Sequence, residues 1–132
     1  MRYQLDSSAC VSALRLSPGN LPGMLDQWRA QDTTLSAIVA AELEVGVHKS
    51  IRPEVQRARL NLFFARLCID PFDEAAVGHY GEIRVELERK GTLIGPLDML
   101  IAAHARSLGA TLITANVGEF RRVKGLKILA WK

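Results

Sequence analysis

The sequence has little cysteine and no long apolar run. Its 132 residues include only two cysteines, Cys10 and Cys68, whose spacing matches no CxxC motif. We therefore exclude a disulfide framework, a zinc site and redox chemistry, and expect both cysteines to be reduced core residues. No stretch approaches 18 consecutive apolar residues, and Asp6 stands where a secretory signal needs its apolar segment. We expect a cytoplasmic protein with no membrane association.

Net charge and aromatic content are also low. The 17 Lys and Arg residues outnumber the 14 Asp and Glu residues only slightly, and aromatic residues make up 6% of the chain. This charge permits a polyanionic partner without arguing for one. The aromatic residues are not interleaved with the basic ones, so they predict no stacking platform for single-stranded nucleic acid. The GxGxxG and P-loop motifs are absent, which excludes the common nucleotide-binding folds.

The sequence does contain enough apolar residues for a core. They form 48% of the chain, a fraction typical of globular proteins. A chain of this length buries roughly 65–70% of its unfolded surface on folding. No internal repeat, low-complexity tract or long linker divides it. We therefore expect a single domain that spans residues 1–132.

Apolar periodicity and turn residues divide the chain into alternating strands and helices. We expect short strands at residues 2–5, 33–36, 67–69, 110–114 and 126–130. We expect helices at residues 7–16, 21–31, 37–47, 53–67 and 96–108, a long helix that begins within residues 71–74 and ends at residue 90, and a polar turn at residues 115–120. The helix at 37–47 is rich enough in apolar residues to be largely buried. The alternation favours an α/β fold with a mainly parallel sheet covered on both faces.

Most polar residues have a simple structural interpretation. Ser7 or Ser8 could cap the first helix, and Asp73 suits the N-cap of the helix that Gly91 ends. We interpret most other acids, with Glu44 and Asp70 among them, as surface or loop charges. The three histidines, His48, His79 and His104, match no metal-binding pattern, so we expect them on helix surfaces or partly buried.

Three acids are placed differently. Asp6 follows a strand and precedes a helix, which puts its carboxylate at the sheet edge where open α/β folds bind ligands, although the position also suits a cap. Glu42 has apolar or small helical neighbours, and its burial without a cation, a metal or hydrogen bonds would cost several kcal/mol. Asp98 opens a helix after Gly95-Pro96, where a dipole-stabilising role and a site role are equally good interpretations.

These acids belong to four segments whose order and spacing form a pattern. The segments are Leu5-Asp6-Ser7-Ser8, Ser36-Ala37-Ile38 through Ala41-Glu42-Leu43 with Gly46, Gly95-Pro96-Leu97-Asp98 with Leu100-Ile101-Ala102-Ala103-His104-Ala105, and Ile113-Thr114-Ala115-Asn116 with Glu119-Phe120. Together they closely resemble the PIN-domain ribonucleases, in particular the VapC-type toxins of bacterial toxin–antitoxin modules. The resemblance covers essentially the whole chain. It implies a three-layer α/β/α sandwich with a central, mainly parallel, short-stranded sheet.

The resemblance also implies a metal-dependent endoribonuclease site. Asp6, Glu42 and Asp98 match the family's three acidic positions, and are expected to hold Mg²⁺ or Mn²⁺ directly or through water. The family's fourth position, often Asp, is Asn116 here, and Glu119 is an acid that could substitute. The fourth ligand is therefore left open between them. Carboxylates gathered in one crevice repel one another, so a hard divalent cation is the partner they require.

Other residues complete the expected site. The resemblance implies that hydroxyls at Ser7 and Thr114 orient the metal-binding carboxylates. An acidic pocket needs basic residues at its rim to hold RNA phosphates, and each candidate could equally be a solvated surface charge. The candidates are Arg15, Lys49, Arg52, Arg121, Arg122 and Lys124.

The resemblance implies the toxin of a type II toxin–antitoxin system. Such a toxin cleaves tRNA or another structured RNA and inhibits translation until a VapB-type antitoxin binds it. We expect the antitoxin in a groove formed by the helices at 21–31 and 53–67, with Leu60 and Phe63 at the groove. A homodimer and a toxin–antitoxin hetero-oligomer are implied, with operator DNA contacted only through the antitoxin. The alternative, suggested by Asn116, is a catalytically impaired PIN domain that acts as an antitoxin-binding and co-repressor module.

Overall fold

The computed structural model describes residues 2–15 and 32–131 of the chain. The strands are β1 (Tyr3–Leu5), β2 (Thr33–Ser36), β3 (Cys68–Asp70), β4 (Thr111–Thr114) and β5 (Lys127–Ala130). The helices are α1 (Ser7–Arg15), α3 (Ala37–Lys49), α4 (Pro53–Phe64), α5 (Glu74–Lys90), α6 (Pro96–Ser107) and α7 (Val117–Phe120). The expected helix at 21–31 lies outside the described residues. The stretch expected as a polar turn at 115–120 contains α7, a helix too short to show periodicity.

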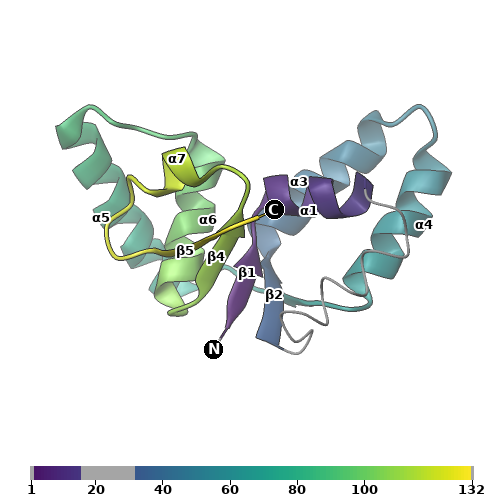
Figure 1. Cartoon of the computed structure of the whole chain (residues 1–132), viewed down its shortest axis with the longest axis horizontal. Helices are drawn as coiled ribbons and strands as arrows, with labels where there is room; N and C mark the ends of the chain where they lie inside the picture. The colour runs from purple at the N-terminus through teal and green to yellow at the C-terminus, as the bar shows by residue number, and fades with distance from the viewer. Residues whose placement is uncertain (1, 16–31, 132) are drawn as a thin grey trace.

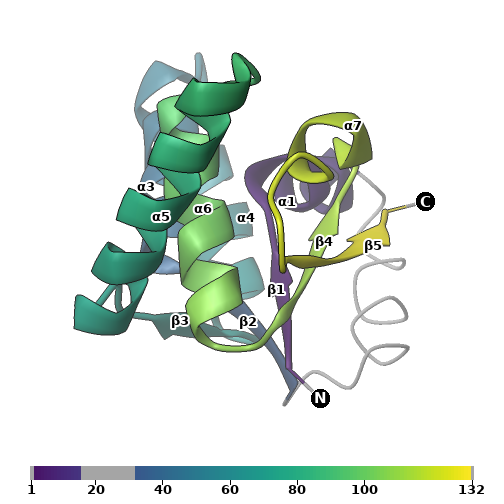
Figure 2. The ribbon, with the colours of Figure 1, turned by 90° about the vertical axis from the view of Figure 1, so that its left-hand side faces the viewer.

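The strands form one parallel sheet in the order β3-β2-β1-β4-β5. Helices α1, α3 and α4 cover one face, and α5 and α6 cover the other (Figure 1). Figure 2 shows the strands in this order, with α7 near β4 and β5. The chain therefore has the expected three-layer α/β/α architecture. Because the strands are parallel, their carboxyl ends meet at one edge, the upper edge in Figure 1, where α1 and α7 lie.

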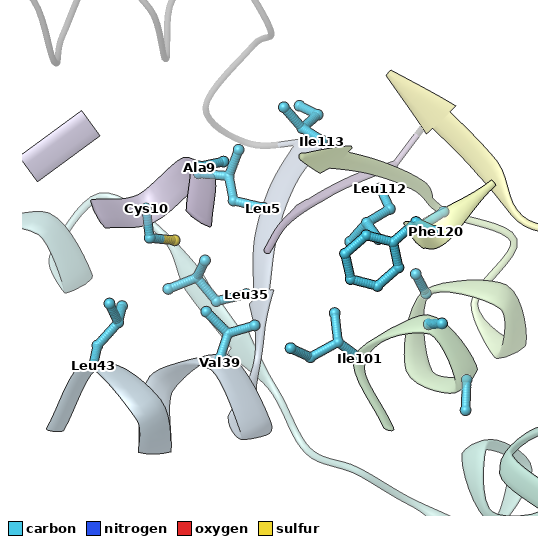
Figure 3. Packing of buried hydrophobic residues seen from close by; sticks show 14 of the residues in the cluster. Leu5, Ala9, Cys10, Leu35, Val39, Leu43, Ile101, Leu112, Ile113 and Phe120 are labelled. Carbon is cyan, nitrogen blue, oxygen red and sulfur yellow. The ribbon is translucent and has the colours of Figure 1, made fainter. Parts of the chain in front are cut away.

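The core consists of two apolar layers on the two faces of the sheet (Figure 3). Leu5 and Leu35 point from neighbouring strands toward α1 and α3, where they meet Cys10. Leu112 points from β4 to the other face and packs with Phe120. All five side chains are buried, so the layers fix the helices that follow the strands.

Three expectations about burial are wrong. Cys68 is exposed because β3 is an edge strand, whereas Cys10 is buried. Helix α3 buries one face only, and its Val45 is 50% exposed, because the other face has no layer above it in the described part of the chain. His104 is 1% exposed, and its Nδ1 lies 2.7 Å from Ser36 Oγ, a partner that lets an imidazole be buried.

Local chemistry sets the helix boundaries. Ser36 caps α3 by accepting the Ile38 N–H at 3.1 Å. Gly91 ends α5 in the left-handed region, with φ at 64°. Asp73 occupies the N-cap position of α5, as expected, but its side chain makes no capping hydrogen bond. None of the helices in the described ranges has the length and hydropathy needed to cross a bilayer.

Candidate active site

Four carboxylates gather at the carboxyl edge of the sheet. Asp6 follows β1, Glu42 lies on α3, Asp98 lies in the first turn of α6, and Glu119 lies on α7. The charges of Glu119, Glu42 and Asp6 all raise the pKa of Asp98. Burial and then the charges of Asp6 and Glu42 likewise raise the pKa of the Cys10 thiol. The structure therefore brings together the four acids that the sequence singled out.

Asp6 is held by three hydrogen-bond donors. Its side chain is buried, and Oδ1 accepts the Ala9 N–H at 2.8 Å. The Ser8 hydroxyl donates to the same carboxylate, 2.7 Å from Oδ1 and 2.9 Å from Oδ2, and Thr114 Oγ1 donates to Oδ2. Asp6 is thus the cap of α1, and the expected cap at Ser7 or Ser8 is wrong. A carboxylate with this many donors has a fixed position.

Glu42 is held by a hydroxyl from the neighbouring helix. Ser7 Oγ donates to Glu42 Oε1 at 2.5 Å, which links α1 to α3. Glu42 is only partly buried, so the complete burial that its apolar neighbours suggested is not observed. The resemblance identified Ser7 as an orienting hydroxyl, and the structure shows that Glu42 is the acid it contacts. Ser8, which was not predicted as a site residue, is the hydroxyl that contacts Asp6.

Asp98 is the most perturbed acid of the cluster. Its pKa is raised from 3.8 to about 6, first by desolvation and then by the charge and hydrogen bond of Glu119, with smaller effects of Glu42 and Asp6. Burial and the three neighbouring acids all raise this pKa, and none of these causes is a cation. A Cβ added at Gly95 would stand 3.3 Å from Asp98 Oδ2, so this glycine leaves room for the carboxylate.

Asn116 contributes its backbone rather than its side chain. Its N–H donates to Thr114 Oγ1 at 2.8 Å, whereas its side chain is exposed and makes no hydrogen bond within the described ranges. Glu119, three residues further on, lies close enough to Asp98 for its charge to raise the pKa of that acid. Of the two candidates for the fourth position, Glu119 is therefore the one that reaches the other acids.

The basic candidates divide into one tethered residue and five free ones. Arg122 Nη1 donates to the Leu93 carbonyl at 3.1 Å, so its guanidinium braces the loop before α6. The others are exposed and form no salt bridge within the described ranges. They are Arg15, Lys49, Arg52, Arg121 and Lys124. Other exposed cations, such as Arg84 and Lys90, pair with acids on their own helix.

A cavity of about 330 Å³ lies between α1, α3 and α4, and Glu42 is among its lining residues. Leu60 lines it from α4, as expected, together with Arg59. Phe63 does not line it and belongs to the core. The groove expected between residues 21–31 and 53–67 stays a prediction, because residues 21–31 lie outside the described residues. In the described part of the chain, α4 faces this cavity together with α1 and α3.

The residues present fit a hard divalent cation. In residues 2–15 and 32–131, no three His, Cys, Asp or Glu side chains are close enough together to enclose a metal ion as they stand. Mg²⁺, however, is commonly bound by one or two carboxylates and completes its shell with water. The uncompensated charge around Asp98 and the all-oxygen donor set are the features such an ion requires.

Comparison with known proteins gives the class of this protein. Residues 3–126 match the family model of the PIN domain, so the chain belongs to the PIN domain family. This membership confirms the family that the sequence motifs predicted.

The chain is also similar to individual proteins and solved structures within this family. The chain is 41% identical over 132 residues to Ribonuclease VapC2 of Rickettsia felis, covering 99% of this chain and 98% of the relative. It is 35% identical over 131 residues to the tRNA(fMet)-specific endonuclease VapC of Salmonella typhimurium, with the same coverage. Among solved structures, VapBC2 from Rickettsia felis bound to a promoter DNA fragment matches with a TM-score of 0.92 and 40% identity, covering all of both chains. DNA-bound VapBC from Salmonella typhimurium matches with a TM-score of 0.93 and 35% identity, covering 100% of this chain and 99% of that one.

Proposed function

We propose that this chain is the endoribonuclease toxin of a type II toxin–antitoxin pair. Its full-length relatives are named as VapC ribonucleases and endonucleases, and its structural neighbours are VapBC complexes. Within the molecule, the observation that carries the proposal is the uncompensated carboxylate cluster of Asp6, Glu42, Asp98 and Glu119. Such a cluster at a sheet edge is suited to metal-assisted hydrolysis of a phosphodiester.

Asp6, Asp98 and Glu42 would hold Mg²⁺ or Mn²⁺, directly or through water, with Glu119 as the fourth acid. When bound, the ion supplies a water of lowered pKa and stabilises the charge that develops on the phosphate. The chain's own contribution is orientation. Three donors hold Asp6, the Ser7 hydroxyl holds Glu42, and Glu119 lies beside Asp98, whose pKa its charge helps to raise.

Asn116 is assigned a supporting role. Its exposed amide is free to position water or an RNA phosphate beside Thr114, whose hydroxyl contacts Asp6. The alternative of an impaired enzyme rested on Asn116 standing at a position that is often Asp. Since Glu119 supplies a fourth acid to the cluster, that alternative is not favoured.

The charge distribution is suited to an RNA substrate. With Asp6, Glu42, Asp98 and Glu119 neutralised by bound cations, 17 basic side chains face the 10 acids that remain of 14. The five exposed cations named above are candidates for phosphate contacts, because they form no salt bridge within the described ranges. We infer that the substrate is tRNA or another structured RNA, as the relative named tRNA(fMet)-specific suggests.

The partner that silences the site is a VapB-type antitoxin. The cavity between α1, α3 and α4 is lined by apolar side chains, by Arg15, Gln56 and Arg59, and by Glu42, so a peptide seated in it would reach the acidic cluster. We infer a toxin homodimer within a toxin–antitoxin hetero-oligomer, with operator DNA bound through the antitoxin, in the cytoplasm.

The test is RNA cleavage by purified, antitoxin-free protein. Wild type, Asp6→Asn and Asp98→Asn are incubated with bulk tRNA in Mg²⁺, Mn²⁺ or EDTA. Asparagine caps helices as well as aspartate, so Asp6→Asn removes the charge and keeps the cap of α1. We expect metal-dependent cleavage by wild type and a loss of at least about 100-fold in both variants. Glu74→Gln, an exposed acid on α5, is the control and should cleave normally. Equal activity of wild type and both site variants, or equal inactivity of all three, would contradict the proposal.

A further inference from the structure

The turn between β4 and α7 is tied to Asp6 through two hydroxyl groups. The Ser8 hydroxyl contacts both oxygens of Asp6 and accepts the Ala115 N–H at 3.1 Å. The Thr114 hydroxyl donates to Asp6 Oδ2 and accepts the Asn116 N–H at 2.8 Å. Two consecutive backbone N–H groups of the turn are therefore connected to one carboxylate, each through one side-chain oxygen.

The direction of these hydrogen bonds is determined by chemistry. A backbone N–H can only donate and an ionised carboxylate can only accept, so each hydroxyl accepts from the turn and donates to Asp6. Ser8 Oγ and Thr114 Oγ1 lie 3.4 Å apart, but neither has a second proton to give the other. Both hydroxyls are thus fixed, and hydrogen bonds arranged in such a chain strengthen one another.

The same network limits how Asp6 can bind a cation. An ionised carboxylate offers about four acceptor sites. Ala9, Ser8 and Thr114 each direct one donor at Asp6, which leaves about one lone pair for any other partner. Asp6 is therefore not free to bind a cation with both oxygens.

We propose that Ser8 is a positioning residue of the active site. It holds Asp6 so that one lone pair faces the carboxylate cluster, and Asp6 binds a divalent cation through a single oxygen. It also fixes the distance between Asp6 and the turn that carries Asn116 and leads to Glu119. This inference rests on the proposed function, because it concerns how the proposed metal ligands are oriented.

The test compares Ser8→Ala with Ser8→Thr and with Ser12→Ala. Ser12 lies on the same helix, and its hydroxyl makes no hydrogen bond within the described residues, so Ser12→Ala is the matched control. Binding of Mn²⁺ is measured by calorimetry, and exchange of the Ala115 amide hydrogen is measured by NMR. We expect Ser8→Ala to weaken Mn²⁺ binding about 10–100-fold, as losses of groups that orient metal ligands do, and to accelerate exchange at Ala115. Ser8→Thr should restore both values, and Ser12→Ala should change neither.

A general loss of stability would not produce this pattern, because the Mn²⁺ affinity is measured on folded protein and the hydroxyl of threonine restores it. Unchanged Mn²⁺ affinity or unchanged Ala115 exchange in Ser8→Ala would overturn the proposal. If Ser8→Ala does not fold, amide hydrogen exchange in the wild-type protein tests the proposal. The Ala115 amide must then exchange as slowly as that of Ala9, and fast exchange would overturn the proposal. If wild type neither binds Mn²⁺ nor cleaves RNA, the proposed function fails. If wild type cleaves RNA but Ser8→Ala has unchanged Mn²⁺ affinity and Ala115 exchange, only the role of Ser8 is overturned.

Discussion

Asp98→Asn should stabilise the metal-free protein at neutral pH. Asp98 is partly buried beside three other carboxylates, and burial, Glu119, Glu42 and Asp6 all disfavour its ionised form. Asparagine has nearly the same shape and carries no charge, so the substitution removes the repulsion without leaving a cavity. A residue proposed to bind a metal is therefore expected to lower the stability of the fold when the metal is absent.

The magnitude follows from the pKa. A rise from 3.8 to about 6 corresponds to about 3 kcal/mol, because one pKa unit is worth about 1.4 kcal/mol. Asp98 is only partly buried, and solvent screening reduces this to about 1–2 kcal/mol. Loss of a carboxylate from the first turn of α6 costs about 0.5 kcal/mol through the helix dipole. We expect a net gain of about 1 kcal/mol in the free energy of unfolding, or about 3–5 °C in Tm.

The gain in stability from Asp98→Asn should be present at neutral pH and disappear at low pH. An acid whose pKa is raised by folding binds more protons in the folded state, so the stability of wild type falls as pH rises from about 4 to about 6. Below this interval Asp98 is neutral in both states, and the advantage of Asp98→Asn should vanish. Taking the difference between variant and wild type cancels other titrating groups, such as His104, whose pKa is lowered mainly by burial.

The assay is thermal unfolding followed by circular dichroism in EDTA, at pH 4 and at pH 7.5. The matched control is Glu74→Gln, because Glu74 is an exposed acid in the first turn of α5 and its loss should lower Tm slightly. A Tm for Asp98→Asn equal to or below that of wild type at pH 7.5 would refute the reasoning, and so would an equal gain at pH 4. Added Mg²⁺ should stabilise wild type more than the variant, because ligand binding stabilises the state that binds it.

Two further substitutions and one double-mutant cycle test the scaffold by urea unfolding. Ser36→Ala should lower the free energy of unfolding by about 2–3 kcal/mol, because it removes the cap of α3 and the hydrogen-bond partner of the buried His104 Nδ1. A loss below about 0.5 kcal/mol would show that the bond between Ser36 and His104 is unimportant. Gly91→Ala should cost about 1 kcal/mol, because φ at this C-cap is 64°, and a stabilised variant would contradict the left-handed cap. A double-mutant cycle on the Arg57–Glu44 pair, whose two contacts are each 2.6 Å, should show only weak coupling, because both side chains are more than a third exposed and solvent screens the pair; a coupling as strong as the effect of Ser36→Ala would contradict this.

The elements of the fold were largely predictable because their signals are local. Apolar periodicity identified every strand of the sheet to within a residue or two, and Pro53 and Gly91 marked the start of α4 and the end of α5. The errors concern tertiary context. Cys68 is as apolar as Cys10, and only the position of β3 at the sheet edge makes it exposed. His104 is buried because Ser36, distant in sequence, supplies its partner.

The sequence predicted which acids belong to the site, but not which hydroxyl group hydrogen-bonds to which acid. Asp6 could be recognised because it follows a strand, and strand ends mark the ligand-binding edge of a parallel sheet. The contact between Ser7 and Glu42 joins residues 35 positions apart, and no local pattern encodes which hydroxyl faces which acid. The role of Ser8 was missed for the same reason, although a hydroxyl two residues after a capping aspartate is a recognisable local hydrogen-bonding pattern.

The protein stabilises the ionised form of Asp6 and destabilises the ionised form of Asp98. Asp6 is buried, yet its charge is met by two hydroxyls and a backbone N–H, so the protein itself stabilises the ionised carboxylate. Asp98 has no such donors within the described residues, and its neighbour Glu119 adds to the repulsion. An ion that arrives at this edge therefore finds one ligand already oriented and another that gains by being neutralised. Rigidity at Asp6 favours a defined geometry, and the uncompensated charge at Asp98 supplies the affinity.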